Sequence, residues 1–238
     1  MARPLIDLLW RDHPAAATHG TRGPRARVAT GAVVDAAIEI ADVHGLSAVT
    51  VRRLGEHLGA SPMSVYTHVN SRDDLLVLMA DSVHARMERI GFGRRHWPGR
   101  VRVVAEANLE LYRTHAWLLD VTDDRTSLGP GTIAKYDHEL HAFDALGLDD
   151  IVRDAALTFV LDFVRANGRA RRPDSRPGEL GDLWATVAPR LAAYVGDDFP
   201  LAGRVGSAAG EAMQAAYSPD HAWRFGLARV IDGLATLS

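Results

Sequence analysis

The sequence predicts an all-α protein, in which a long helix joins an N-terminal three-helix, helix-turn-helix head to a C-terminal helical domain. Two observations predict this class. Apolar residues recur at i, i+3 and i+4 along most of the chain, the spacing of a buried helix face. Glycine and proline clusters separate these stretches, where helices end. We predict an N-terminal arm at residues 1–27, the head at residues 28–90 and the second domain at residues 91–238.

Composition limits the class of protein. The 238 residues are 47% hydrophobic and 24% charged, values typical of soluble globular proteins. No apolar run reaches the ~18 residues of a membrane helix, and Asp7 interrupts the short apolar patch at Leu5–Trp10. The chain has no cysteine, so it has no disulfide and no thiolate metal site. We expect a cytoplasmic protein with no membrane partner, and we assign it no cofactor and no metal site.

The overall charge is not that of a strongly basic nucleic-acid binder, because the formal net charge is −3. The N-terminal arm nevertheless carries a basic cluster of Arg22, Arg25 and Arg27 directly before the first helix. Residues 11–27 lack apolar periodicity, so we expect disorder or order only on binding. Two interpretations stay open: a solvated tail, or an arm that lies along DNA phosphates or enters the minor groove.

The first helix of the head is expected to begin at Thr30, a fair N-cap, and to end at Gly45. Its broad apolar face includes Val33, Ala37 and Ile40. The helices of the head therefore surround a small core, and Leu46 and Val49 enter it from the following turn.

The recognition motif lies at residues 50–69. Leu54 and Leu58 mark one short helix, Gly59 ends it, and Ser61 caps a second helix that has Pro62 at its first position. Val65 and Val69 point inward from the second helix, whose other face carries Met63, Ser64, Tyr66, Thr67 and His68. This face is hydrogen-bonding and has no acid, which fits a DNA major groove.

Taken alone, this pattern is more often an ordinary helical hairpin whose polar face meets water.

Arg53 and Glu56, at i and i+3, are expected to form an exposed pair or to be solvated. Ser71 caps a long helix that follows, with a buried stripe from Leu75 to Met87. That helix is too long to end inside the head, so it connects the head to the second domain.

Residues 30–87 resemble the DNA-binding head of the TetR family of bacterial transcriptional repressors. The resemblance rests on HGL at 44–46, TVRRLGEHLG at 50–59, SPMSVYTHV at 61–69 and SRDDLL at 71–76. The run YTHV is similar to the tetracycline-repressor branch in particular. The resemblance covers roughly a quarter of the chain and implies a DNA-binding regulator, a repressor released from its operator by a small-molecule ligand, and not an enzyme.

By this resemblance, Arg52 reads a guanine edge, to which an arginine can bond in a bidentate manner. Pro62 and Met63 contact bases or sugars, and Ser64 contacts a thymine methyl group or a phosphate. Met63 replaces the proline usual in the tetracycline-repressor branch, which leaves the base preference there open.

The resemblance assigns phosphate contacts to Tyr66, His68 and Arg72. Protonation of His68 would strengthen its contact. Thr67 replaces a tryptophan, which indicates a different contact. Because one head reaches few base pairs, we expect a homodimer with heads ~34–36 Å apart on a palindromic operator.

In the second domain we expect helices at residues 101–112, 131–146, about 150–166, 180–195 and from about 221, with a short apolar piece at 115–121. Asp149 or Asp150 is expected to cap the helix at about 150–166, and residues 196–210 are left unassigned. The helix from about 150 is apolar nearly all round, so it must be buried on two sides.

We predict that this helix and the last one form a four-helix bundle with a second copy. The predicted interface residues are Ile151, Ala155, Phe159, Phe163, Trp223, Leu227, Val230 and Leu234. The alternative is that both helices belong to the core of one protomer.

The resemblance also implies a small-molecule pocket in the second domain. The candidate lining is His84, Met87, Asn108, Tyr112, Trp117, Tyr136, His141, Phe143 and Phe159. No His/Glu set can be matched to the magnesium-bound tetracycline site of that branch, so tetracycline itself is not supported as the effector.

The sequence leaves two other functions open. One is a ligand-independent regulator or an activator on the same scaffold. The other is a helical protein or enzyme in which the hairpin is incidental. His138, Glu139 and His141 lack the HExxH spacing of zinc proteases, and no phosphate-cradling glycine loop or Gly-x-Ser-x-Gly motif is present. The regulator is therefore the favoured interpretation.

Overall fold

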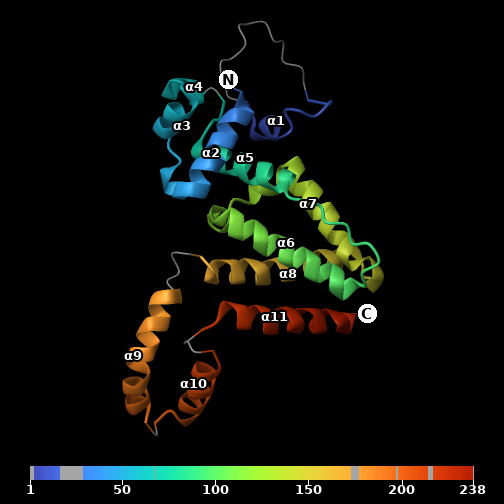
Figure 1. Ribbon diagram of the computed structural model, residues 1–238. Coiled ribbons are helices and arrows are strands. Elements are labelled where there is room, and N and C mark those ends of the chain that lie inside the picture. Colours follow the sequence, from blue (N-terminus) through green and yellow to red (C-terminus); the bar gives the residue numbers. More distant parts are fainter. Residues whose placement is uncertain are drawn as a thin grey trace, which may run out of the picture.

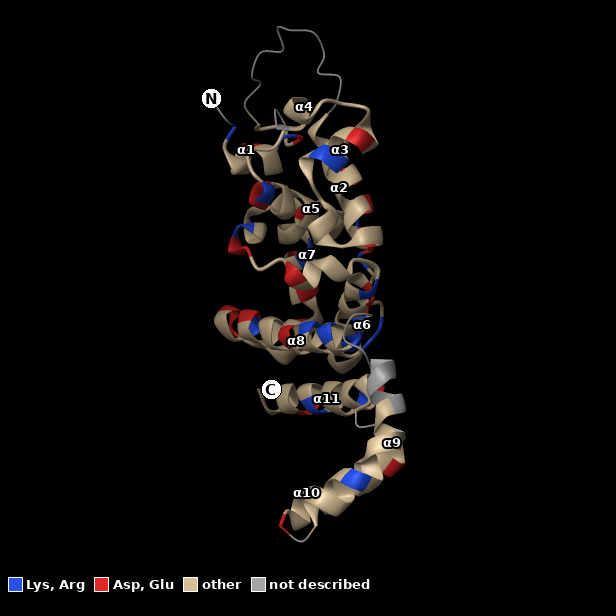
Figure 2. Ribbon diagram, turned by 90° about the vertical axis from the view of Figure 1, so that its left-hand side faces the viewer, with Lys and Arg blue, Asp and Glu red and all other residues tan. Residues whose placement is uncertain are grey.

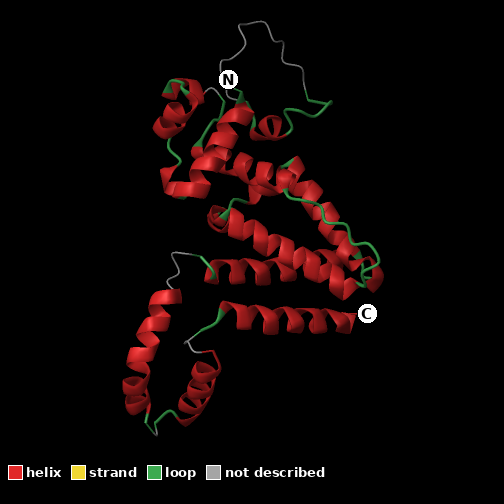
Figure 3. Ribbon diagram, viewed as in Figure 1, coloured by secondary structure: helices red, strands yellow, loops and turns green. Residues whose placement is uncertain are grey.

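Figure 1 shows the computed structural model of the chain, which describes residues 3–16, 29–66, 68–172, 177–196, 198–213 and 217–237. These residues form helices and connecting loops without a strand (Figure 3). The predicted all-α class is therefore confirmed. Across the same residues, no helix combines the length and the apolar sequence needed to cross a membrane.

The N-terminal part of the chain forms a compact group of short helices (Figure 1). They are α1 (Leu5–Leu9), α2 (Thr30–His44), η1 (Leu46–Ala48), α3 (Val51–Leu58), α4 (Pro62–Tyr66) and α5 (Arg72–Arg86). Helix α2 packs against both α3 and α5. The head is thus built on α2, and α5 leads out of it.

The caps predicted for the helix-turn-helix are present. Thr50 Oγ1 accepts a hydrogen bond from Arg53 N at 3.2 Å, and Ser61 Oγ accepts one from Ser64 N at 3.3 Å. Gly59 has φ +60°, a left-handed conformation that glycine adopts without steric cost. These contacts satisfy backbone N–H groups that a helix start leaves unpaired, so local chemistry sets both boundaries of the turn.

Two head boundaries differ from the prediction. Helix α2 begins at Thr30 but has Ala29 at its N-cap, with no side-chain cap, so the capping role expected for Thr30 is wrong. Helix α4 ends at Tyr66, and His68 lies in the turn that follows. Thr67 lies outside the described residues.

The N-terminal segment docks on the head and on the second domain. Leu8 and Leu9 of α1 are buried, and α1 packs against α5. Trp10 Nε1 donates to the carbonyl oxygen of Leu128 at 2.9 Å, and Asn70 Nδ2 donates to that of Arg3 at 2.8 Å. The arm predicted at residues 1–27 therefore starts as a packed helix. Arg22, Arg25 and Arg27 lie outside the described residues.

The second domain begins after a loop at residues 87–96. Its elements are α6 (Trp97–Thr114), η2 (Ala116–Asp120), η3 (Asp124–Leu128), α7 (Pro130–Leu140), η4 (His141–Leu146), α8 (Asp150–Ala170), α9 (Pro177–Val195), α10 (Pro200–Met213), α11 (Pro219–Leu234) and η6 (Ala235–Leu237). The helix expected at residues 131–146 is divided between α7 and the 3₁₀ segment η4. Asp149 caps α8 with two hydrogen bonds of 3.0 Å, from Ile151 N and Val152 N.

Helices α6, α8 and α11 lie side by side at the end of the molecule away from the head (Figures 1 and 2). Helices α9 and α10 form a hairpin that projects from this layer. The hairpin carries few charged residues among the part of the chain that the structure describes (Figure 2). Several of its large apolar side chains are exposed: Leu183, Leu191, Tyr194, Phe199, Leu201 and Val205.

Helix α5 is joined closely to the start of α7. Asp81 on α5 accepts a hydrogen bond from Thr132 N at 2.8 Å, and His84 Nδ1 lies 2.9 Å from Thr132 Oγ1. Burial raises the pKa of Asp81, and hydrogen bonds from Thr132 and Gly131 oppose that rise. A Cβ at Gly131 would lie 2.2 Å from the backbone oxygen of Asp81. Glycine is therefore required for this approach.

We expect Gly131→Ala to lower the free energy of unfolding by about 1–3 kcal/mol, the usual cost of overpacking. Its methyl group would meet backbone of α5, which cannot move aside as a flexible side chain could. Chemical denaturation measures the change. Gly233→Ala on α11 is the matched control, because a Cβ there would meet no atom within 4 Å, and we expect it to be neutral or stabilising. Equal stability of the two variants would contradict the close contact.

Candidate nucleic-acid interface and ligand cleft

Helix α4 presents the face predicted to contact DNA. Val65 and Val69 are buried, as the spacing predicted, so the opposite side of the motif faces outward. Met63 is 74% exposed and Pro62 is also exposed, while Ser64 is partly buried. The backbone of Tyr66 ends the helix, and its side chain lies outside what the structure describes. Pro62, Met63 and Ser64, which are predicted to enter the groove, thus lie on one short helix that is accessible to solvent.

Arg52 projects from the start of α3 into solvent. Its side chain is 86% exposed, and its Nε lies 3.4 Å from Glu56 Oε1 at i+4. Of the two alternatives for Arg53, the pairing with Glu56 is wrong, because Glu56 pairs with Arg52 instead. An exposed pair of this kind contributes only tenths of a kcal/mol, so Arg52 can exchange Glu56 for a DNA base. Figure 2 shows the neighbouring basic and acidic residues on α3.

The two flanking phosphate candidates are held by the head itself. His68 is partly buried, with Nδ1 3.5 Å from Thr30 Oγ1. Partial burial lowers the pKa of His68, which opposes the protonation that would strengthen a phosphate contact. Arg72 is exposed and donates from Nη2 to the carbonyl oxygen of Leu46 at 2.9 Å. That bond leaves other N–H donors of the guanidinium for an anion.

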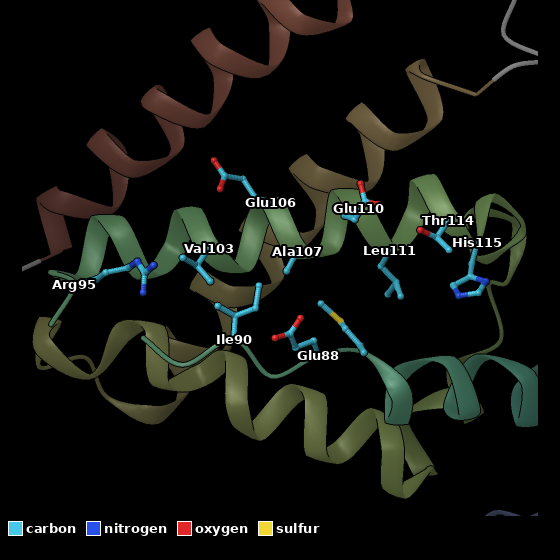
Figure 4. Close-up of a pocket in the computed structure, with 11 residues that line it drawn as sticks. Glu88, Ile90, Arg95, Val103, Glu106, Ala107, Glu110, Leu111, Thr114 and His115 are labelled. Carbon is cyan, nitrogen blue, oxygen red and sulfur yellow. The ribbon is translucent and has the colours of Figure 1, made fainter. Parts of the chain in front are cut away.

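A cleft of about 510 Å³ opens between α6 and the segment that follows α5 (Figure 4). This volume falls in the ~300–1,000 Å³ range of small-molecule sites. Val103, Ala107 and Leu111 of α6 face Ile90 and Glu88 across the cleft (Figure 4). Met87, the residue after α5, also lines it. One wall of the cleft is therefore the segment that begins at the C-cap of α5, the helix that leads to the head.

The rest of the lining is polar. Arg95 lies at one end of the cleft and His115 at the other (Figure 4). Glu106 and Glu110 also line it. Two hydrogen bonds from Arg113, at 2.5 and 2.6 Å, hold Glu110 and lower its pKa. An apolar strip with hydrogen-bonding groups at both ends can hold a small molecule and fix its orientation.

A buried polar network lies behind the cleft. Glu139 accepts from Lys135 Nζ and from Asn108 Nδ2, each at 2.6 Å. A small crevice shares Met87 and Val103 with the cleft and reaches Lys135 and Glu139. Burial lowers the pKa of Lys135, and the nearby Glu139 opposes that shift. The bond from Asn108 of α6 to Glu139 of α7 joins these two helices. Lys135, on the same helix as Glu139, supplies the countercharge, and removal of either charged partner would leave a buried charge.

The structure does not bring the nine predicted pocket residues into one cavity. Met87 lines the cleft, Asn108 belongs to the buried network, and Tyr112 lines a second cavity beside Gly168. The others lie elsewhere: Phe143 and Trp117 are buried in the core, His84 contacts Thr132, Tyr136 and His141 bond to Asp154 and Asp144, and Phe159 is exposed on α8.

The cleft residues that the prediction missed share one sequence signal. Val103, Ala107 and Leu111 recur at i+4 on α6, and Glu106 and Glu110 recur beside them. The prediction followed the other stripe of this helix, from Val101 to Tyr112, which packs into the core. The second stripe of α6, which combines apolar and acidic residues, could therefore have indicated the cleft from the sequence.

The predicted dimer residues divide into two groups. Leu227, Val230 and Leu234 are buried inside the protomer, and the rings of Phe163 and Trp223 stack at 5.4 Å within it. Burial of the first three residues and stacking of the two partly buried rings therefore engage these five side chains within one protomer. Ile151, Ala155 and Phe159 of α8 are exposed, with Ile151 83% and Phe159 55% accessible.

Comparison with known proteins agrees with this architecture. Residues 33–79 match the sequence model of bacterial regulatory proteins of the tetR family, and residues 92–238 match that of the tetracyclin repressor-like C-terminal domain. The HTH-type transcriptional repressor DrrR1 of Streptomyces coeruleorubidus is 30% identical over 240 residues, which cover 98% of this chain and 85% of that protein.

Solved structures have the same fold. ActR of Streptomyces coelicolor, in complex with actinorhodin, superposes with a TM-score of 0.72 at 25% identity, covering 90% of this chain and 98% of that one. BioQ, solved with its double-stranded DNA operator, superposes with a TM-score of 0.57 at 20% identity, covering 88% and 99%. The latter likeness concerns the fold alone.

A helix-turn-helix head on an all-α second domain defines a DNA-binding transcriptional regulator. The chain belongs to the TetR family, with a C-terminal domain of the tetracycline-repressor-like type.

We expect Arg52→Ala to weaken binding to a cognate DNA fragment by about 1–3 kcal/mol and to relax base preference at one position. Competition binding against singly substituted fragments measures both effects. Arg113→Ala is the matched control, because Arg113 also forms an exposed pair with a glutamate on its own helix but lies in the second domain. Unchanged affinity and base preference in Arg52→Ala would show that α3 does not read DNA as assigned.

Proposed function

We propose that this chain is a homodimeric repressor that leaves a palindromic operator when a small molecule occupies the cleft between α6 and the segment that follows α5. The observation that carries the proposal is that Met87 is the C-cap of α5, with its N–H bonded to the carbonyl oxygen of Val83, and also lines the cleft. A ligand that moves this end of α5 tilts the head at its other end, and two tilted heads no longer fit successive major grooves.

The assignment of individual residues to DNA belongs to the same proposal. Arg52, Pro62, Met63 and Ser64 would contact bases, and Tyr66, Thr67, His68 and Arg72 would contact backbone or bases, with Arg22, Arg25 and Arg27 as an additional basic arm. Exposure of Arg52 and Met63 supports the first set. We place the functional division near residue 90, between the head with α5 and the domain from residue 91, and we place the protein in the cytoplasm with its DNA.

The proposal of a small-molecule effector has two supports. The cleft has the size and mixed lining of a ligand site. ActR, which has the same fold, was solved with actinorhodin bound. The apolar strip on α6 suits a flat or elongated apolar body, and Arg95 and His115 at the two ends suit polar substituents.

The proposed dimer contact uses the free face of α8. Ile151, Ala155 and Phe159 lie one helical turn apart on this face, and Phe225 on the neighbouring α11 is also exposed. Exposed apolar side chains gathered on one helix face are of the kind that marks an association site. The α9–α10 hairpin comes between α8 and α11 in the sequence. We propose that its exposed apolar side chains extend the same contact.

We expect Phe159→Glu to convert the dimer to a monomer and to abolish tight operator binding, because one head alone contacts few base pairs. Sedimentation and a binding assay on the same sample measure both effects. Val43→Glu is the control for added charge, since Val43 is 74% exposed but lies on α2 in the head, and this variant should stay dimeric. A dimeric Phe159→Glu protein would exclude this face of α8.

A gel shift with DNA from the protein's own promoter region tests the function. We expect specific retardation, and a log–log plot of affinity against salt concentration should fall linearly as phosphate contacts are replaced by counterions. Adding compounds, starting with actinorhodin, then seeks those that abolish the shift. Absence of any shift at low salt would contradict DNA binding. A shift that no ligand of the cleft relieves would favour a ligand-independent regulator.

A further inference from the structure

Asp42 joins the head directly to the second domain, at a point separate from α5. It lies near the C-terminal end of α2, and its Oδ1 accepts two hydrogen bonds from residues far away in sequence. The donors are His115 Nδ1 and Trp117 Nε1, each at 2.7 Å. His115 caps the end of α6, and Trp117 lies in η2. One carboxylate oxygen of the head is thus held by two rings of the second domain.

These bonds are short and partly shielded from water. The side chains of His115 and Asp42 are 20% and 27% exposed, and Trp117 is buried. The rings of His115 and Trp117 meet edge to face, with centroids 6.1 Å apart. Charge-assisted bonds in such surroundings are stronger than exposed ion pairs, which water and salt screen. The contact therefore fixes the end of α2 relative to α6.

The same His115 ring also lines the cleft, at the end opposite Arg95 (Figure 4). A molecule in the cleft and the carboxylate of Asp42 therefore meet the same side chain. Trp117, in contrast, bonds to Asp42 without lining the cleft. Of the two donors to Asp42, His115 is the one that a bound ligand reaches.

We propose that His115 is a positioning residue that transmits occupancy of the cleft to the head through Asp42 and α2. A ligand that draws the His115 ring away from Asp42 removes one of two bonds that hold α2 in its DNA-binding orientation. This route acts beside the one through α5 and Met87, and it rests on the proposed function. Coupling between the sites is reciprocal, so operator binding must change the affinity of the cleft for its ligand by the same factor, and we expect it to alter the contact of Asp42 with these rings.

Binding of operator DNA to single-site variants tests this role without knowledge of the effector. His115→Ala removes the bond and should weaken operator affinity by about fivefold or more, the lower end of typical coupling factors. His115→Asn keeps an N–H donor at the position of Nδ1 but removes the rest of the ring, so it should keep nearly wild-type affinity. The slope of affinity against salt should stay unchanged in both, since no phosphate contact is lost.

His141→Ala is the matched control. His141 forms a comparable bond, with Nδ1 2.9 Å from Asp144 Oδ2, but that bond lies within the second domain and does not reach the head. Its operator affinity should equal that of the wild type. If His115→Ala binds operator as tightly as His141→Ala does, the proposed coupling is wrong.

Fluorine NMR of protein labelled with 5-fluorotryptophan gives a second readout. Trp117→Phe assigns the Trp117 signal among those of the five tryptophans. Operator DNA should shift this signal in wild-type protein and shift it less in His115→Ala. A Trp117 signal that stays in place while wild-type protein binds operator would overturn the inference and leave the proposed function intact. A wild-type protein that binds no DNA would overturn both.

Discussion

Asp81 on α5 accepts a hydrogen bond from the first turn of α7, and Gly131 lets the two backbones approach closely. The rest of the structure depends on this junction. Helix α5 packs against α2 in the head and against α7 in the second domain, so it belongs to both cores at once. Closely packed interiors transmit displacement, because side chains there have few voids in which to relax. A shift of α7 must therefore move α5, and a shift of α5 must move the head.

The cleft lies next to this junction between α5 and α7, so a molecule bound there can displace α5. Its wall includes Met87 at the end of α5. Behind it, Asn108 of α6 donates a hydrogen bond to Glu139 of α7, and Glu139 also forms a buried pair with Lys135 on its own helix. The buried pair tolerates little change of geometry, since separated charges in a low-dielectric site are costly. One side of the cleft, formed by α6 packed on α7, is thus rigid, while the other side is continuous with the helix that leads to the head. Such a combination favours two discrete arrangements over a continuous deformation.

The head could be predicted almost completely from the sequence because local chemistry determines it. Thr50, Gly59, Ser61 and Ser71 act on backbone groups within three or four residues, and each has the predicted role. The candidate ligand site could not be predicted in this way. His84, Phe143 and Tyr136 have the right chemistry for a pocket. However, His84 contacts Thr132, Tyr136 donates a hydrogen bond to Asp154, and Phe143 is buried in the core. Which polar or aromatic groups remain free depends on partners that are distant in sequence.

The sequence by itself determined the helical class, the helix-turn-helix with its caps and the outward face of α4, since apolar period and capping residues act over one or two helical turns. Only the tertiary structure decided which stripe of α6 meets the core and which lines a cleft, because both stripes recur at helical spacing. It also decided that α8 keeps a free apolar face while most of the predicted α11 residues turn inward. The contact of Asp42 with His115 and Trp117 is of the same kind: it joins residues more than seventy positions apart, and no local rule specifies such a pairing.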